Sequence, residues 1–142
     1  MAPDNPRAMP LRTRILTRFR RPWTAVLAGG IIGSAVRTGV SYYLPAAPGR
    51  MPVATLIVNL AGSLLLGFYL VRREQTVTAP LSLQFWGIGV FGSFTTFSTF
   101  SIEVVHLLGQ SQAATAIAYI ATSIVGGLTL ALFGQRLGSV IR

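Results

Sequence analysis

The sequence contains no cysteine, no lysine, one histidine and only three acidic residues. Without cysteine it has no disulfide framework and no cysteine-based metal site or nucleophile. The single histidine, His106, cannot form a multi-histidine metal site on its own. Charged residues make up 11% of the chain, against about 25% in an ordinary soluble domain. Because 51% of the residues are hydrophobic, the composition predicts a membrane protein.

The positive charge is strong but unevenly distributed. The net charge is +9, and all twelve basic residues are arginines, six of them within the first 21 residues. Most of the others lie in short gaps between apolar segments, which is how charge flanks membrane helices. This distribution favours a lipid bilayer as the partner and argues against a nucleic-acid surface.

Residues 1–22 are polar, rich in arginine and interrupted by four prolines. This composition predicts a disordered or surface-lying cytoplasmic tail. A basic stretch before an apolar segment is also typical of a signal peptide. The segment that follows is too long for a usual signal-peptide core and contains Arg37, so we expect the tail to be retained.

Four apolar segments fill the rest of the chain, which predicts an all-α integral membrane protein whose transmembrane domain covers residues 23–142. Each is near or above the roughly 20 residues that cross a bilayer core of about 30 Å. Small residues spaced four apart, such as Gly29 and Gly33, predict closely packed helices. Four helices enclose little, so a pore needs a second copy. The segments are residues 24–44, 53–71, 81–108 and 113–133.

The arginines also predict the orientation of the helices. The N-terminal tail, the loop with Arg72 and Arg73, and the C-terminal Arg136 and Arg142 lie on one side and hold ten arginines. The other side has Arg50, and Arg37 lies near that end of the first helix. By the positive-inside rule both termini are cytoplasmic.

The third apolar segment carries the densest polar cluster. Residues 95–101 include five hydroxyl side chains and two phenylalanines, shortly after Gly92. One interpretation is a helix broken in the middle of the membrane, which is tolerated where the backbone is buried or lines a cavity. Carbonyls freed at such a break can bind a cation. The other is a continuous helix whose Ser and Thr bond their own backbone. Physical arguments leave both open.

Two further features have an ordinary and a functional interpretation. Phe91, Phe94, Phe97 and Phe100 recur every three residues, as in a packing or lipid-facing stripe. Their positive ring edges could instead face an anion that must bind and then leave. Asn59, in the second segment, could join two helices by a hydrogen bond or donate its amide to an anion path.

The ionisable and hydroxyl residues in these segments also have more than one possible role. Arg37 could extend to the membrane interface or attract anions into a vestibule. Tyr119 and Ser123 are four residues apart and share a helix face, where Ser123 either bonds its own backbone or extends a polar track. Glu103 is an awkward direct neighbour for an anion unless it is protonated or bonded to a donor.

Taken in order, these residues resemble the Fluc/CrcB family of fluoride channels. The resemblance rests on Gly29-Gly-x-x-Gly-x-x-x-Arg37, on Thr55-Leu-x-Val-Asn59-x-x-Gly-Ser, and on Gly92-x-x-Thr-Thr-Phe-Ser-Thr-Phe-Ser-x-Glu103. It covers residues 24–138. It implies a fluoride-selective channel that exports fluoride across the cytoplasmic membrane, not an enzyme, built as an antiparallel, dual-topology dimer.

The resemblance also implies roles for single residues. Asn59 would be the pore asparagine, and Phe97 and Phe100 would border the fluoride path. Gly92 and Thr95 would offer backbone carbonyls to a structural sodium ion at the dimer interface. The polar lining would comprise Thr96, Ser98 and Ser123, with Tyr119 near it and Arg37 at the vestibule.

The ten-to-two arginine bias departs from a dual-topology pattern, because such a chain must insert both ways. The partner is therefore either a second copy or an oppositely oriented homologue. The alternative function is a proton-coupled small multidrug exporter, which needs a membrane-buried carboxylate. Only Glu103 could supply it.

Overall fold

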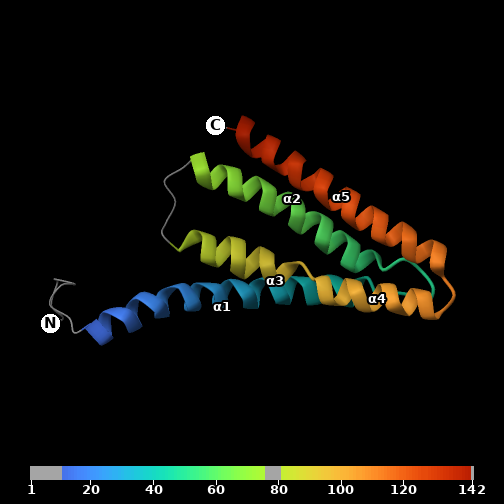
Figure 1. Ribbon diagram of the computed structural model, residues 1–142, viewed down its shortest axis with the longest axis horizontal. Coiled ribbons are helices and arrows are strands. Elements are labelled where there is room, and N and C mark those ends of the chain that lie inside the picture. Colours follow the sequence, from blue (N-terminus) through green and yellow to red (C-terminus); the bar gives the residue numbers. More distant parts are fainter. Residues whose placement is uncertain (1–10, 76–80, 142) are drawn as a thin grey trace.

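The computed structural model describes residues 11–75 and 81–141, with side chains from Pro22 onward. Within these ranges every regular element is a helix (Figure 1). In chain order the elements are α1 (Leu11–Tyr43), α2 (Val53–Gln75), η2 (Leu83–Phe91), α3 (Gly92–Phe94), α4 (Phe97–Gly109) and α5 (Ala113–Val140).

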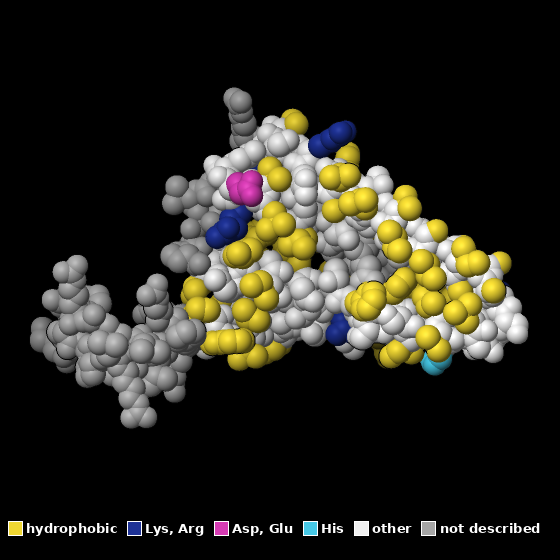
Figure 2. Space-filling view, viewed as in Figure 1, with side chains coloured by type: hydrophobic (Ala, Val, Ile, Leu, Met, Phe, Trp, Pro, Cys, Tyr) yellow, Lys and Arg dark blue, Asp and Glu magenta, His cyan; other side chains and the backbone are white. Residues whose placement is uncertain are grey.

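In the part of the chain that the structure describes, four stretches are long and apolar enough to cross a membrane, which confirms the number predicted. They are Pro22–Tyr43, Val53–Gln75, Leu83–Gly109 and Ala113–Val140. Large apolar side chains lie on the outer surface of the bundle, among them Ile31, which is 71% exposed, and Ile117, which is 66% exposed. Figure 2 shows such side chains spread over the visible face. A surface of this kind suits lipid or a second protein and not water.

The helices extend beyond the apolar segments. Helix α1 begins at Leu11 and not near residue 24, and α5 continues to Val140 and not to residue 133. Residues 1–10 of the predicted tail lie outside the described residues, whereas the rest of it is helical. Helical hydrogen bonding depends on the backbone, so it continues through Arg, Leu and Gln, which favour helices, past the last membrane-facing side chain.

The helices form two close pairs, α2 with α5 and α1 with η2. Glycine makes both pairs possible, because it has no Cβ at the point of contact. A Cβ added at Gly67 would overlap the Ala131 carbonyl oxygen, and one at Gly134 would overlap that of Leu64. A Cβ at Gly33 would overlap the Val90 carbonyl oxygen. The predicted close packing at these small residues is confirmed.

Element η2 is a wide helix of the π type, in which bonds span five residues. The Gly92 N–H, for example, bonds the Gly87 carbonyl. Wide turns of this type occur frequently at functional sites. Here η2 leads through α3 directly to a change in backbone direction.

The backbone is extended at Thr95 (φ −77°, ψ 159°) and at Thr96 (φ −148°, ψ 124°), between α3 and α4. Helix α4 then begins with a side-chain cap, in which Thr96 Oγ1 accepts a hydrogen bond of 3.2 Å from the Thr99 N–H. We refer to residues 95 and 96 as the interruption. In Figure 1 it lies near the middle of the bundle, where α3, α4 and α1 meet.

The loop between α1 and α2 and the turn between α4 and α5 lie at the same end of the bundle, opposite the start of α1 and the end of α5 (Figure 1). Gly49 in the loop adopts a left-handed φ of +72°, and a Cβ placed there would lie 3.6 Å from Gln112 Cγ in the turn. The two connections therefore contact each other.

Candidate functional site

A cavity with a volume of about 390 Å³ lies against the interruption. Helices α2, α4 and α5 and the interruption contribute its walls. None of its lining residues carries a charge. They are Asn59, Gly62, Ser63, Leu66, Thr95, Thr96, Phe97, Phe100, Ser123 and Ile124.

Asn59 holds the interruption in place by two hydrogen bonds. Its Nδ2 donates to the Thr96 carbonyl at 3.0 Å, and its Oδ1 accepts from the Thr96 N–H at 2.8 Å. The Asn59 side-chain oxygen therefore replaces the helical acceptor that the Thr96 N–H has lost, and its NH₂ group gives the Thr96 carbonyl, at the N-cap of α4, an additional donor. One of the two Nδ2 hydrogens remains for a ligand in the cavity, because an amide NH₂ has two donors.

At the interruption, the carbonyls of Gly92 and Thr95 are among those that lose their usual helical donors. In a continuous α-helix the Gly92 oxygen would accept from the N–H of Thr96, and the Thr95 oxygen from the N–H of Thr99. The Thr96 N–H instead bonds Asn59 Oδ1, and the Thr99 N–H bonds Thr96 Oγ1. These are the two carbonyls that the family resemblance assigns to sodium.

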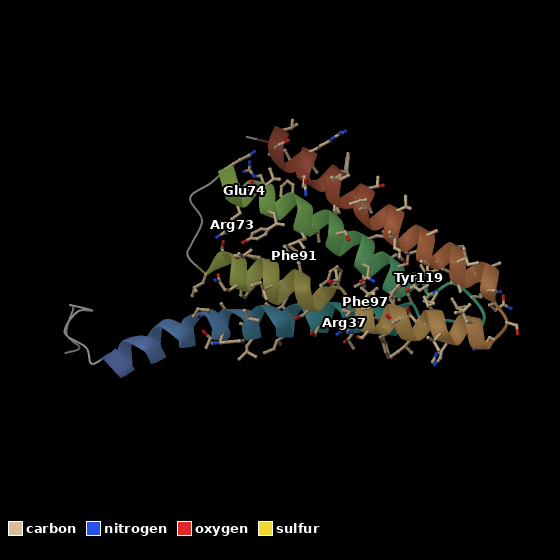
Figure 3. All side chains as sticks on the ribbon, in the orientation of Figure 1. Arg37, Arg73, Glu74, Phe91, Phe97 and Tyr119 are labelled. Atoms are coloured by element: carbon tan, nitrogen blue, oxygen red, sulfur yellow. The ribbon has the colours of Figure 1, made fainter. Side chains whose placement is uncertain are left out.

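Arg37 contacts the interruption from α1. Its Nε donates to the Ser93 carbonyl at 3.2 Å, at the C-terminal end of α3 (Figure 3). The carbonyl end of a helix carries partial negative charge, and a guanidinium placed there offsets it. Arg37 therefore supports the broken segment and does not line the cavity.

The two predicted phenylalanines both line the cavity but differ in burial. Their ring centroids are 6.0 Å apart. Phe97 is 80% exposed, at the start of α4, whereas Phe100 packs against Tyr119 with ring centroids 5.0 Å apart. The other two phenylalanines of the regular series, Phe91 and Phe94, are not among the residues that line the cavity. Phe91, for example, packs against Tyr69 with ring centroids 5.8 Å apart.

The hydroxyl groups in and around the cavity differ in their hydrogen-bond partners. Ser63 Oγ bonds its own helix at the Asn59 carbonyl, at 2.8 Å. Ser123 Oγ is buried and has no hydrogen-bond partner among the described residues. Ser98 lies outside the cavity, where its Oγ is 3.3 Å from Thr96 Oγ1. The Ser123 hydroxyl is therefore the one lining hydroxyl among the described residues that is still able to bond a ligand in the cavity.

A second polar group links three helices beside the cavity. The Glu103 carboxylate accepts a hydrogen bond of 2.8 Å from Thr55 Oγ1 and one of 2.7 Å from the Tyr119 hydroxyl. Thr55 is 4% exposed and Tyr119 is fully buried. Figure 3 shows Tyr119 on α5, close to α4. This linkage ties α2, α4 and α5 together.

Three residues of the site, Thr55, Gly62 and Ser63, were not predicted to belong to it. Thr55 lies one turn before Asn59 on the same face of α2, a spacing that could have pointed to it. Gly62 is needed because an added Cβ would overlap Thr95 Cγ2. Of the residues predicted by resemblance, Tyr119, Arg37, Gly92 and Ser98 lie around the cavity without lining it.

Carboxylates and histidines do not cluster into a metal site within the described residues. A cation at the interruption would be held by carbonyl oxygens, the ligands that hard cations prefer. The Gly92 and Thr95 carbonyls fit this donor set, since their helical donors are engaged elsewhere.

The chain matches known proteins over most of its length. The family profile described as "CrcB-like protein, Camphor Resistance (CrcB)" matches residues 24–135. A "Fluoride-specific ion channel FluC" of Saccharophagus degradans is 44% identical over 104 residues, which cover 72% of this chain and 78% of the relative. A "Fluoride-specific ion channel FluC 2" of Bacillus subtilis is 40% identical over 120 residues, covering 82% and 86%.

A third relative, "Fluoride-specific ion channel FluC" of Deinococcus radiodurans, is 39% identical over 119 residues, which cover 82% of this chain and 94% of the relative. The region matched by the family profile covers most of each of the four helices that are long enough to cross a membrane, and it contains the interruption and the residues that line the cavity. The chain is therefore a multi-pass membrane protein that belongs to the CrcB family.

Proposed function

We propose that this protein is a fluoride-selective channel that lets fluoride leave the cytoplasm and so lowers its toxicity. The observation that carries the proposal is the uncharged cavity at the interruption, walled by an amide, hydroxyls and two aromatic rings. The names of its relatives support fluoride as the conducted ion.

The chemistry of the wall suits a small, strongly hydrated anion. Fluoride must exchange its water for donors, which Asn59 Nδ2 and Ser123 Oγ can supply. Conduction also requires release, so binding must stay weak. Ring edges of Phe97 and Phe100 meet this requirement, because they are weakly positive and carry no formal charge.

The interruption, on this proposal, lies near the middle of the membrane and at the interface of an antiparallel dimer. Two carbonyls from each chain, at Gly92 and Thr95, would then converge on one structural sodium ion. When bound, this ion attracts an anion nearby by simple Coulomb interaction. The exposure of Phe97, at 80%, supports a partner that covers this part of α4.

The partner is either a second copy or an oppositely oriented homologue. The arginine bias favours one fixed orientation with both termini in the cytoplasm. A chain with one fixed orientation forms an antiparallel dimer only with a homologue of opposite bias. A chain that inserts both ways forms it with itself.

The decisive experiment measures fluoride release from proteoliposomes that hold the purified chain, with a fluoride electrode and a chloride control. We expect fast fluoride release without chloride release. If the chain alone releases no fluoride, reconstitution with a homologue of opposite charge bias tests the heterodimer. If neither preparation releases fluoride, the channel assignment is overturned.

Variants separate the channel from the multidrug exporter. We expect Phe100→Ile to slow fluoride release at least about tenfold, because the ring borders the path, whereas the matched variant Phe133→Ile leaves it unchanged. Phe133 lies on the outer surface of α5 and is 56% exposed. An exporter would instead require Glu103 as a proton carrier, and Glu103→Gln would abolish proton-driven drug transport.

A further inference from the structure

Helix α1 begins before the part of it that can cross a membrane. The membrane-crossing stretch starts at Pro22, whereas the helix starts at Leu11. Figure 1 shows the start of α1 extending past the ends of the other helices. Trp23, which is 65% exposed, lies at the junction, and tryptophan is enriched at the level of the lipid headgroups. Residues 11–21 therefore form a helical extension that begins in the headgroup layer.

The membrane-crossing part of α1 has one face toward the bundle and one face away from it. Gly29 and Gly33 lie against η2, because a Cβ added at either position would overlap a carbonyl oxygen of that element. On the other side Leu27 is 65% exposed and Ile31 is 71% exposed. At about 100° per residue, the exposed residues between positions 24 and 38 all fall within one half of the helix circumference. We call this half the outer face of α1.

The arginines of the extension continue the outer face. At the same helical register, this half of the extension holds four of its five arginines, and the inner half holds its large apolar residues. The four arginines are Arg14, Arg18, Arg20 and Arg21. The apolar residues are Leu11, Ile15, Leu16 and Phe19, and Arg12 lies among them. Positions 18, 20 and 21 are within about 6 Å of Pro22 along the helix axis, which is comparable to the depth of a headgroup layer.

The sequence offers little negative charge to neutralise this cluster. Residues 11–23 contain no acidic residue, and the whole chain has three against twelve arginines. A second copy of the chain would therefore bring more positive than negative charge. Anionic phospholipids do supply the missing charge, and each arginine just outside a membrane helix strengthens their association about fivefold.

We propose that Arg18, Arg20 and Arg21 form a binding site for anionic phospholipid headgroups on the outer face of α1, with Arg14 one turn further from the membrane. The site selects anionic over zwitterionic lipid by charge. The inference requires the membrane-crossing helices and does not rest on fluoride conduction.

The test measures which lipid lies next to Trp23 in the full chain. Trp86→Phe leaves Trp23 as the only tryptophan. This parent is reconstituted in vesicles of phosphatidylcholine and phosphatidylglycerol in equal amounts. One or the other lipid is brominated on its acyl chains, because bromine quenches tryptophan fluorescence on contact. We expect phosphatidylglycerol to be preferred at least about fivefold in about 0.1 M salt, and the preference to fade in about 1 M salt.

Two triple variants of this parent locate the site. Arg18→Gln with Arg20→Gln and Arg21→Gln should abolish the preference. Arg12→Gln with Arg50→Gln and Arg136→Gln removes the same charge from outside the site and should keep it. If the first triple variant does not reconstitute, Arg20→Gln alone should reduce the preference.

Three results would overturn the proposal. The parent could show no preference, or the preference could survive the changes at residues 18, 20 and 21. Its loss in both triple variants would also overturn the proposal, because net charge and not this site would then select the lipid. None of these results bears on the fluoride channel, which the electrode measurement tests separately.

Discussion

At the scale of single residues, Asn59 is the side chain on which the shape of the interruption depends. Asn59→Ala leaves the Thr96 N–H without its acceptor and removes the side-chain donor to the Thr96 carbonyl. Each unsatisfied group costs about 1–3 kcal/mol when buried. We expect a less stable protein and at least about a tenfold loss of fluoride release, measured by thermal unfolding in detergent and by the fluoride electrode.

Asn59→Asp is the informative companion to that variant. The Asp side chain is nearly the same size as Asn and still accepts from the Thr96 N–H. However, a negatively charged oxygen replaces the NH₂ group that donates to the Thr96 carbonyl. We expect it to fold better than Asn59→Ala and still to conduct no fluoride, because a carboxylate would face the cavity. Normal conduction by either variant would contradict the assignment of Asn59.

The bonds to Glu103 yield a prediction about stability. Tyr119→Phe and Thr55→Val each remove one hydrogen bond to the carboxylate, and bonds to charged groups contribute about 1.5–3 kcal/mol. Unfolding in detergent should show a loss of that size for each variant. Thr38→Val, at an exposed position on α1, should change stability by no more than about 0.5 kcal/mol. If the three variants are equally stable, the hydrogen bonds to Glu103 do not stabilise the fold.

Sequence reasoning could select Asn59 but not its partner. The two interpretations were a hydrogen bond between helices and an amide in an anion path, and neither identified the backbone peptide of Thr96, which Asn59 bonds. Such a partner has no signature in the residue types. The linkage from Thr55 to Tyr119 was missed for a related reason, because the rotation of each helix about its axis is set by packing.

At the scale of the helices, glycine determines how closely α2 and α5 approach. Gly67→Ala would drive a Cβ into the Ala131 carbonyl oxygen. Overpacking of this kind typically costs about 1–3 kcal/mol, and we expect a reduced yield of folded protein and a lower unfolding temperature. Gly109→Ala is the matched control, since nothing lies within 4 Å of a Cβ placed there. If the two variants behave alike, close backbone contact is not what holds this pair.

The number and order of the helices followed from hydropathy, but their ends did not. The apolar segments predicted α2 to end near residue 71, and it continues through Arg72 and Arg73 to Gln75. Hydropathy reports the side chains in contact with lipid, whereas the helix ends where its backbone bonds end. The regular phenylalanine series does not lie on one continuous helix, because the backbone is extended at Thr95 and Thr96, between Phe94 and Phe97.

At the scale of the whole molecule, the arginine bias predicts one orientation. The chain has no cysteine, so single cysteines can report the sides of the membrane. We expect Gln112→Cys to react with a membrane-impermeant thiol reagent on intact spheroplasts. Ser139→Cys, at the other end of the bundle, should react only after permeabilisation. Both positions are exposed. Partial labelling of both from outside would instead show two orientations and favour a homodimer.

The pairing of α2 with α5 has a consequence for synthesis. Helix α2 ends at Gln75 and its main partner begins at Ala113, so residues 76–112 are made in between. At a translation rate of about 5–20 residues per second, α2 waits about 3–13 s before α5 is complete. During that interval its glycine-lined face meets lipid or another chain. In a truncated protein that lacks α5, this face of α2 stays unpaired. Membrane proteases can then recognise the truncated protein as misfolded.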